Sequence, residues 1–290
     1  MTEPPVPEPV AFDLAPLEFR DVLPMDFPHP LQSVVMPVMA MQDGVVHLRG
    51  TAFSIGGNLA LTATHVLRRD DDLDDVALLH VVPGPVAGSA HATLLPVADV
   101  TAHEDQADVA VLRLDLPSHV QLQPLRVGAA PPATTDRVAI FGYTHEGVLG
   151  TLDEVLQLRP KLNVSDGTVV DHYPLGGAVC SYPSFQIDAR VDSQMSGGPI
   201  LATIEGGLMA VRGVVCTGMD VMEGDVPLSF GSMTFTALAL TPLVARGGEL
   251  QPTSLYDLAA NGLIPVVDLH LVDFDTSDPD NPRIGLSVST

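Results

Sequence analysis

The sequence predicts an all-β protein made of two antiparallel β-barrels. Short apolar runs rich in Val, Leu, Ile and Thr alternate with turns drawn from 25 Gly and 26 Pro residues, a pattern typical of strands with tight connections. Hydrophobic residues make up 46% of the 290-residue chain, which is enough for a substantial core. The runs form two groups separated by a stretch rich in Pro and Ala, so we expect one small barrel from each group.

The first group of runs follows an N-terminal arm. Residues 1–30 carry many prolines and little periodicity, and we expect an extended arm that is either disordered or laid along the surface. Residues 31–126 are expected to form the N-terminal barrel, and residues 127–136, VGAAPPATTD, a linker. The strand-like runs of this barrel are QSVVMPVMAM, VVHLRGTAFSI, NLALTATHV, VALLHVV, ATLLPVADVTA and DVAVLRLD.

The second group of runs predicts the C-terminal barrel over residues 137–245. Its strand-like runs are RVAIFGY, FQIDARV, PILATI, LMAVRGVVC and MTFTALAL, and TPLVARGG near its end is typical of a helical turn. Residues 246–290 are expected to hold a short C-terminal helix and a strand-like tail. The helix prediction rests on TSLYDLAANG, which has a Thr or Ser cap before it and Asn-Gly at its end.

Composition excludes several classes of function. The net charge is -23, with only 13 Lys and Arg residues, so the chain lacks the basic clusters that nucleic acid or an anionic membrane requires. We therefore expect neither as a partner. The sequence has no zinc-type spacing and no phosphate-binding loop, so no metal and no organic cofactor is expected. The acidic run RRDDDLDD is typical of a solvated loop.

The N-terminus predicts a cytoplasmic location. MTEPPVPEPVAF has neither the basic nor the apolar region of an export signal, and no run of about eighteen apolar residues follows it. We therefore expect a soluble protein that is not exported. The two cysteines, Cys180 and Cys216, could pair if they came close, but buried free thiols are the default in a reducing compartment.

Three short motifs suggest nucleophilic catalysis. VDSQMSGGPI places Ser196 before two glycines, a pattern that a tight turn alone would also explain. LTATHVL puts His65 at the end of an apolar strand, and ADVAVLRLD puts Asp108 at the head of another. A serine nucleophile needs a base to take its proton and an acid to orient that base. The order His, Asp, Ser is that of the double-barrel serine protease template, and a cleft between the barrels would bring the three residues together.

Over about residues 45–245 the chain resembles the trypsin-like, chymotrypsin-fold serine protease superfamily, and within it the bacterial HtrA-type proteases. RGTAFSIGGNLALTATHVL resembles the strand pair that ends in the catalytic His, and DVAVLRL the Asp strand. RVAIFGY resembles the strand that opens the second barrel, and FQIDARVDSQMSGGPIL the segment leading to the nucleophile. VRGVV and FTALALTPLV resemble the substrate-pairing strand and the closing segment. The resemblance implies two six-stranded barrels and a serine endopeptidase.

The resemblance also implies a role for each catalytic residue. His65 would accept the Ser196 proton and later pass it to the leaving amine, while Asp108 would hold the imidazole tautomer. The backbone N–H groups of Gln194 and Ser196 would form the oxyanion hole. The family usually has glycine where this chain has Gln194, and a non-glycine residue can present its N–H only with backbone angles open to it. An activity that stays latent until a partner or substrate opens the hole is therefore one expectation.

The same resemblance predicts where substrate binds. An extended protein or peptide would add as a strand along Val214, Val215 and Cys216. Arg190, six residues before Ser196, corresponds to the base of the S1 pocket, where it would pair with an acidic P1 side chain. The alternative for Arg190 is a strand residue that points to solvent.

Two further functional classes stay open. A catalytically silent module with the protease fold would bind peptides in the same cleft, and a purely structural all-β domain would leave the ordered motifs as coincidence. About 45 residues follow the protease core, fewer than the ~50 that a domain usually needs, so the PDZ domain common in HtrA-type proteases is not expected. A protease in the cytoplasm needs restraint, so an activating partner is plausible.

Overall fold

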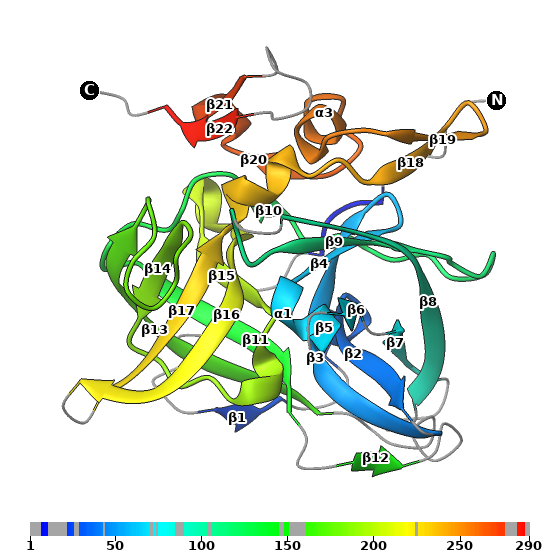
Figure 1. The fold of residues 1–290 in the computed structure, drawn as a ribbon, viewed down its shortest axis with the longest axis horizontal. Helices are drawn as coiled ribbons and strands as arrows, with labels where there is room; N and C mark the ends of the chain where they lie inside the picture. The colour runs from blue at the N-terminus through cyan, green and yellow to red at the C-terminus, as the bar shows by residue number, and fades with distance from the viewer. Residues whose placement is uncertain are drawn as a thin grey trace.

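A computed structural model of the chain shows two β-barrels side by side, with the C-terminal elements lying across one end of the pair (Figure 1). The structure describes residues 7–10, 22–25, 29–42, 44–69, 72–73, 75–84, 90–103, 106–144, 148–150, 161–223, 226–275 and 283–287.

The first barrel is a closed ring of six antiparallel strands. The ring runs β3-β2-β7-β8-β9-β4 and closes where β4 pairs with β3. Its strands are β2 (Val35–Gln42), β3 (Val45–Gly56), β4 (Leu59–Thr62), β7 (Val76–Pro83), β8 (Ala90–Ala102) and β9 (Ala110–Leu114). All of them fall inside the range predicted for this barrel.

The hairpin from β3 to β4 leads into the segment that carries His65. Gly57 and Asn58 both have positive φ, 61° and 60°, which suits the two-residue turn of a twisted hairpin. From Gly50 to Gly56 every residue of β3 is buried, because one face lies inside the barrel and the other against neighbouring structure. The apolar run of the sequence therefore marks a strand covered on both faces.

The second barrel is also a closed ring of six antiparallel strands, β11-β13-β14-β17-β16-β15, which closes where β15 pairs with β16. Its strands are β11 (Arg137–Tyr143), β13 (Leu162–Tyr173), β14 (Ser184–Ile187), β15 (Pro199–Thr203), β16 (Met209–Glu223) and β17 (Val226–Met233). The prediction of two six-stranded antiparallel barrels is confirmed.

Two strands of this second barrel were not predicted. β13 contains Gly167 and β17 contains Gly231, and glycine within a run weakens the strand signal. A Cβ at Gly167 would lie 2.7 Å from the Ala189 Cβ, so this glycine lets a neighbouring segment approach closely. MTFTALAL, predicted as a strand, instead holds the end of β17 and a buried 3₁₀ turn at Thr234–Ala239.

One apolar cluster joins the two barrels. Alternate residues of β11 fall into different clusters, because successive side chains of a strand point to opposite faces. Val138 and Ile140 pack with residues of the second barrel, whereas Phe141 and Tyr143 belong to a cluster that contains the core of the first. The buried Tyr143 hydroxyl donates to the Val35 carbonyl at 3.2 Å. This shared core fixes how the barrels sit relative to each other.

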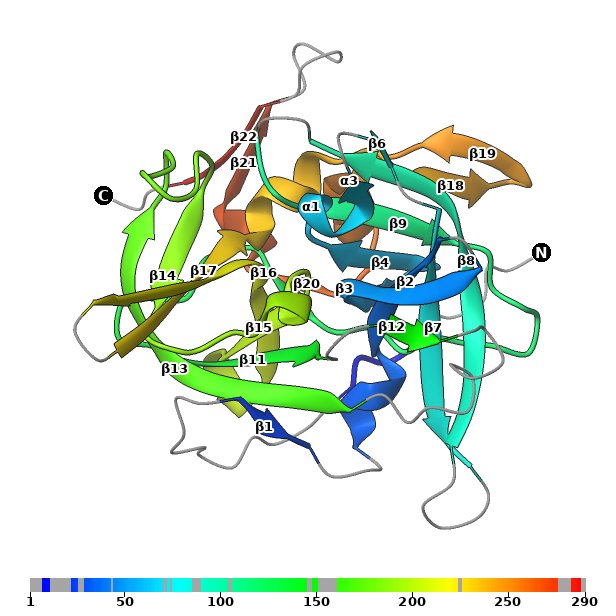
Figure 2. The same ribbon diagram turned by 60° about the horizontal axis from the view of Figure 1, so that its bottom comes forward.

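The remaining elements brace the barrels from outside. The described parts of the arm lie on them: β1 pairs with β13 (Figure 2), and the Val10 N–H donates to the Pro124 carbonyl. In the predicted linker, β10 pairs in parallel with β16 and β20. The shorter elements are β1 (Leu23–Pro24), α1 (Thr64–Leu67), β5 (Arg68–Arg69), β6 (Asp72–Leu73), β10 (Val127–Gly128), β12 (Val148–Gly150), β18 (Leu243–Arg246), β19 (Glu249–Pro252), α3 (Leu255–Ala260), β20 (Val266–Val267), β21 (Val272–Asp275) and β22 (Arg283–Leu286). Further 3₁₀ turns are Pro30–Ser33, Ser193–Met195, Glu205–Gly207 and Leu269–Leu271.

The C-terminal region agrees with the sequence in one helix and differs in one turn. α3 forms where TSLYDLAANG predicts it, with the Ser254 hydroxyl accepting from the Asp257 N–H at 3.0 Å. TPLVARGG is not a helical turn but the first strand of the β18–β19 hairpin. Gly247 and Gly248 have φ of 61° and 91°, so Gly-Gly is the hairpin turn here. Within the described ranges, no helix has the length and apolarity needed to cross a membrane.

We predict that Gly142→Ala destabilises the protein by about 1 to 3 kcal/mol, as overpacking does in a filled core. A Cβ at position 142 would lie 2.7 Å from the Cα of Met195, next to the serine turn. Urea unfolding would measure the loss. Gly285→Ala is the matched control, because it also adds one methyl group to a strand but meets no atom within 4 Å. Equal stability of the two variants would contradict the close approach at Gly142.

Candidate active site

His65 lies where the first barrel faces the second. β4 ends at Thr62, and the chain turns through Ala63 into the short helix α1, which carries His65. The residues on either side of His65, Thr64 and Val66, are buried, whereas its own side chain is 46% exposed. The backbone at His65 is therefore fixed by its buried neighbours, while the imidazole ring remains accessible.

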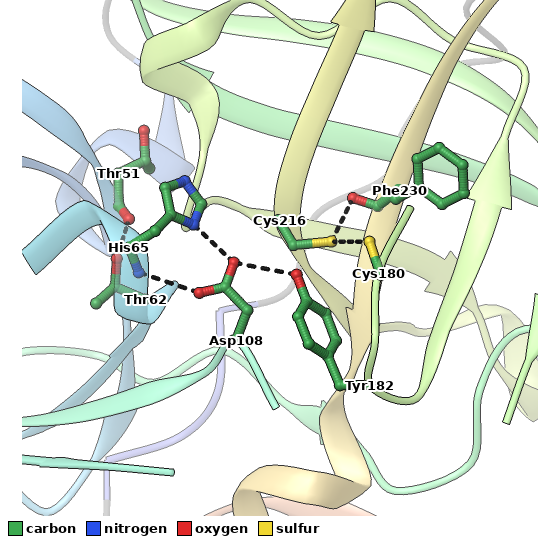
Figure 3. A network of polar contacts seen from close by, with 8 residues as sticks. All are labelled: Thr51, Thr62, His65, Asp108, Cys180, Tyr182, Cys216 and Phe230. Atoms are coloured by element: carbon green, nitrogen blue, oxygen red, sulfur yellow. Dashed lines mark hydrogen bonds and ion pairs between the residues drawn. The ribbon is translucent and has the colours of Figure 1, made fainter. Parts of the chain in front are cut away.

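Asp108 contacts His65 through both of its carboxylate oxygens. It lies just before β9, which pairs with β4, so the barrel itself brings the two residues together. Oδ1 accepts the His65 backbone N–H at 3.0 Å, and Oδ2 lies 2.6 Å from His65 Nδ1 (Figure 3). The Asp108 side chain is only 11% exposed. This arrangement fixes both the position of the imidazole ring and the nitrogen that faces the carboxylate.

Ser196 stands on a turn of the second barrel that requires both following glycines. Gly197 has φ of 82°, a left-handed conformation that favours glycine. A Cβ on Gly198 would run into the Phe141 carbonyl oxygen, and one on Gly197 into the Thr51 carbonyl oxygen. The serine turn is thus pressed between strands of both barrels, and Ser196 itself is 6% exposed.

Thr51, on β3 of the first barrel, fastens the serine turn. Its N–H donates to the Ser196 carbonyl at 2.8 Å, and its hydroxyl donates to the Gln194 carbonyl at 3.0 Å. The same hydroxyl accepts the Tyr143 N–H at 2.9 Å. The Thr62 hydroxyl, near His65, donates to the Thr51 carbonyl at 2.7 Å. One buried residue therefore links the serine turn, the His65 strand and the second barrel.

The main chain before Ser196 is coiled into a 3₁₀ turn over Ser193–Met195. The Met195 N–H donates to the Asp192 carbonyl at 2.9 Å, and the Ser196 N–H lies 3.5 Å from the Ser193 carbonyl oxygen. In the described part of the chain the Ser196 hydroxyl makes no hydrogen bond, to His65 or to any other residue. A carbonyl oxygen thus faces the Ser196 N–H that an oxyanion would need.

One of the predicted substrate-strand residues, Val215, hydrogen-bonds to the serine turn. The Val215 N–H donates to the Gly198 carbonyl at 2.9 Å, and the Val215 carbonyl accepts the Gly197 N–H at 2.8 Å. Val214 and Val215 are fully buried. The main-chain N–H and carbonyl groups of Val215 are therefore already hydrogen-bonded in this structure, and peptide pairing along Val214, Val215 and Cys216 stays a prediction. β15 ends its pairing with β16 at Val214, so an added strand would start at Cys216.

Arg190 fits the alternative that the sequence left open. Its side chain is 58% exposed and its Nε lies 3.3 Å from an oxygen of Asp192. The Arg190 side chain is thus largely exposed in this structure, and its pairing with an acidic P1 side chain stays a prediction.

A cluster of sulfur and aromatic side chains adjoins Asp108 from the second barrel. Cys180 and Cys216 are free and buried, with their Sγ atoms 3.8 Å apart, and Cys216 Sγ donates to the Phe230 carbonyl at 3.1 Å. The hydrogen-bond contact between the two thiols lowers the pKa of Cys180 to about 7, whereas burial raises the pKa of Cys216. The Tyr182 hydroxyl donates to Asp108 Oδ2 at 3.4 Å (Figure 3). No spacing or motif in the sequence singles out Tyr182, Thr51 or the Ser193 carbonyl.

Two closed antiparallel barrels, with a His–Asp pair on one and a glycine-supported serine turn on the other, define the chymotrypsin-like class of protein. A family model described as a trypsin-like peptidase domain matches residues 50–211, a range that includes His65, Asp108 and Ser196. The chain belongs to this family. No curated protein matches the chain, and the closer likeness to HtrA-type proteases stays a prediction.

We predict that Thr51→Val destabilises the protein by about 1 to 3 kcal/mol, because it leaves the half-buried Gln194 carbonyl and the buried Tyr143 N–H without their partner. Valine keeps the shape of threonine, so the change isolates the hydroxyl. Thr203→Val is the control, since Thr203 is exposed and its hydroxyl donates to the Met209 sulfur at 3.4 Å; we expect under about 0.5 kcal/mol there. Equal unfolding midpoints for the two variants would contradict the role of Thr51.

Proposed function

We propose that the protein is a serine endopeptidase that cuts extended polypeptides through an acyl-enzyme on Ser196. The observation that carries this proposal is the two-point contact of Asp108 with His65, facing a serine turn on the other barrel. A histidine on a surface helix has no structural need for a carboxylate that binds both its backbone and its ring. A general base does need one, because its ring must be held in one orientation and one tautomer.

In this mechanism each group has one task. With Nδ1 facing Asp108, Nε2 of His65 takes the proton of the Ser196 hydroxyl as Ser196 attacks the peptide carbonyl. His65 then passes that proton to the leaving amine, which departs and leaves the acyl group on Ser196. Water, activated by His65 in the same way, hydrolyses the acyl-enzyme. Asp108 stays ionised and stabilises the imidazolium.

The substrate in this proposal is a protein or peptide segment in extended form. β16 pairs with β17 as far as Glu223, whereas its pairing with β15 ends at Val214. A peptide could add to β16 from Cys216 onward by main-chain hydrogen bonds. Folded proteins would be poor substrates, because their backbone groups are already paired.

The proposed enzyme rests in a latent state. The Ser193 carbonyl faces the Ser196 N–H, whereas catalysis requires the N–H groups of Gln194 and Ser196 to face the oxyanion together. Rotation of the peptide between Ser193 and Gln194 would remove the carbonyl and supply the second donor. Substrate or an activating partner would drive this change by binding the open form more tightly.

A silent peptide-binding module is the second candidate, and the same 3₁₀ turn favours it. If the Ser193 carbonyl always stays on the Ser196 N–H, the oxyanion hole never forms and the cleft binds peptides without cutting them. Reactivity of Ser196 toward a phosphonate separates the two functions, because the reagent reacts only with a serine activated by a basic histidine. The experiment can be done without knowing the substrate.

We predict that a fluorophosphonate adds one phosphonyl group to the protein, on Ser196, as read by intact mass and peptide mapping. His65→Ala and Ser196→Ala should each abolish the adduct with the fold unchanged, because loss of a triad member costs several orders of magnitude in rate. Asp108→Asn should slow the reaction by about four orders of magnitude through the wrong imidazole tautomer. Asp115→Asn is the matched control, since Asp115 follows the same strand β9.

Labelling that survives Ser196→Ala would reject the proposed nucleophile. A larger loss in Asp115→Asn than in Asp108→Asn would show that the wrong carboxylate had been chosen. A protein that stays unlabelled, yet binds extended peptides, would favour the silent module.

We also predict that Gln194→Gly raises the rate of labelling. Gln194 is not among the residues with positive φ, and glycine opens backbone angles closed to glutamine, so the 193–194 peptide can rotate more readily. A missing donor costs about 10² to 10³ in rate, which sets the largest gain to expect. A ratio of variant to wild-type rate at or below one, with the fold intact, would reject latency at this peptide and leave Ser196 as a nucleophile.

A further inference from the structure

We propose that Tyr182 is a positioning residue that holds Asp108 from the second barrel and thereby sets the basicity of His65. The inference rests on the proposed function of His65 as a base. Tyr182 lies in the segment between β13 and β14, far in sequence from both residues. Its hydroxyl donates to Asp108 Oδ2 at 3.4 Å, the oxygen that also faces His65 Nδ1 at 2.6 Å.

The first step of the argument is the need of the carboxylate for donors. Asp108 is 11% exposed, and a carboxylate removed from water is stable only when its oxygens accept hydrogen bonds. His65 supplies two donors, its backbone N–H and its Nδ1–H, if the ring carries the proton there. Tyr182 supplies a third, and it comes from the other barrel (Figure 3).

The second step is that the neighbouring thiols do not donate a hydrogen bond to Asp108. Cys216 lies on β16 next to the same cluster, but its Sγ donates to the Phe230 carbonyl at 3.1 Å and contacts Cys180 Sγ at 3.8 Å. The Tyr182 ring packs against the cluster that these cysteines form with Phe230. The cysteine side chains therefore pack on the ring, and Cys216 also lies within hydrogen-bonding reach of the phenol hydroxyl. The hydroxyl itself donates to the carboxylate.

The third step concerns the proton on the phenol. Burial, followed by the nearby Cys216 and Asp108, raises the pKa of Tyr182. The hydroxyl consequently keeps its proton throughout the neutral range and acts as a donor. A donor on Oδ2 disperses part of the negative charge that would otherwise stabilise the imidazolium, so its removal should raise the pKa of His65.

The test compares Tyr182→Phe with Tyr173→Phe. Tyr173 packs on the same cluster, but its hydroxyl donates to Gln186 at 2.8 Å and not to Asp108. The His65 pKa is measured by NMR on histidine-labelled protein, with the His65 signals assigned from their absence in His65→Ala. We expect an upward shift of a few tenths of a pH unit to about one unit in Tyr182→Phe, and none in Tyr173→Phe.

Phosphonate labelling gives the kinetic counterpart. A higher His65 pKa leaves less free base at neutral pH, so Tyr182→Phe should react more slowly at pH 7, by at most about 2-fold for a shift of a few tenths of a unit and at most about 10-fold for one unit, and recover at higher pH. A purely structural role would lower the rate equally at all pH values without moving the midpoint. In an Asp108→Asn background the second substitution should no longer shift the His65 pKa, because the two effects share one hydrogen bond.

Two outcomes would overturn the inference: an unchanged His65 pKa in folded Tyr182→Phe, or an equal shift in the control. If Tyr182→Phe fails to fold, 3-fluorotyrosine incorporated in its place keeps the phenol and strengthens the donor, and it must then lower the His65 pKa. The titration needs no reactive serine. A wild-type protein without an adduct would therefore defeat the proposed function, while the His65 pKa would still decide the role of Tyr182.

Discussion

The position of the serine turn depends on the hydrogen bonds of Thr51, a residue of the opposite barrel. All of its polar groups are used: the N–H on Ser196, the carbonyl on Thr62, and the hydroxyl on both Gln194 and Tyr143. Because Thr51 is fully buried, none of these bonds can be exchanged for water without cost. Glycines at 197 and 198 permit this close contact, and the placement of the serine relative to His65 follows from it.

The site therefore belongs to neither barrel alone. The first barrel supplies His65 and Asp108 and holds them together through the pairing of β4 with β9. The second supplies the serine turn, and it also sends Tyr182 back to the carboxylate. Each barrel thus carries part of the candidate site. Each also carries a residue, Thr51 or Tyr182, that hydrogen-bonds to the part on the other barrel. The apolar cluster that both barrels share holds them in a fixed relative position, which these short hydrogen bonds between the barrels require.

The sequence predicted the parts of this site that lie within short motifs. His65 and Asp108 were found because each stands at the end of an apolar strand, and Ser196 because its two glycines are visible as a turn signal. The Ser193 carbonyl could not be found, since the orientation of one peptide bond leaves no mark on residue types. The bonds of Val215 to the serine turn could not be predicted either, because the point at which β15 ends its pairing with β16 is a matter of register.

The same reasoning explains the misses in the fold. β13 and β17 carry Gly167 and Gly231 in their interiors, so their composition resembles loops although their surroundings make them strands. Gly247 and Gly248 were a hairpin signal taken for the end of a helix. For Gly167 and Gly231 the deciding contacts come from residues distant in sequence, which local patterns do not contain.

The parallel pairing of β10 with β16 and β20 bears on how the chain folds as it is synthesised. The Val211 N–H donates to the Arg126 carbonyl, while the Val127 and Ala129 N–H groups donate to the carbonyls of Pro265 and Val267. Strand β16, which follows the serine turn in the chain, is thus tied, through the linker, to residues made late in translation. A nascent chain that has just emerged past residue 211 already contains both partners of the Val211–Arg126 bond but lacks Pro265 and Val267, so the native architecture is still incomplete. The segment matched by the family model, residues 50–211, therefore omits residues that hold the linker in place.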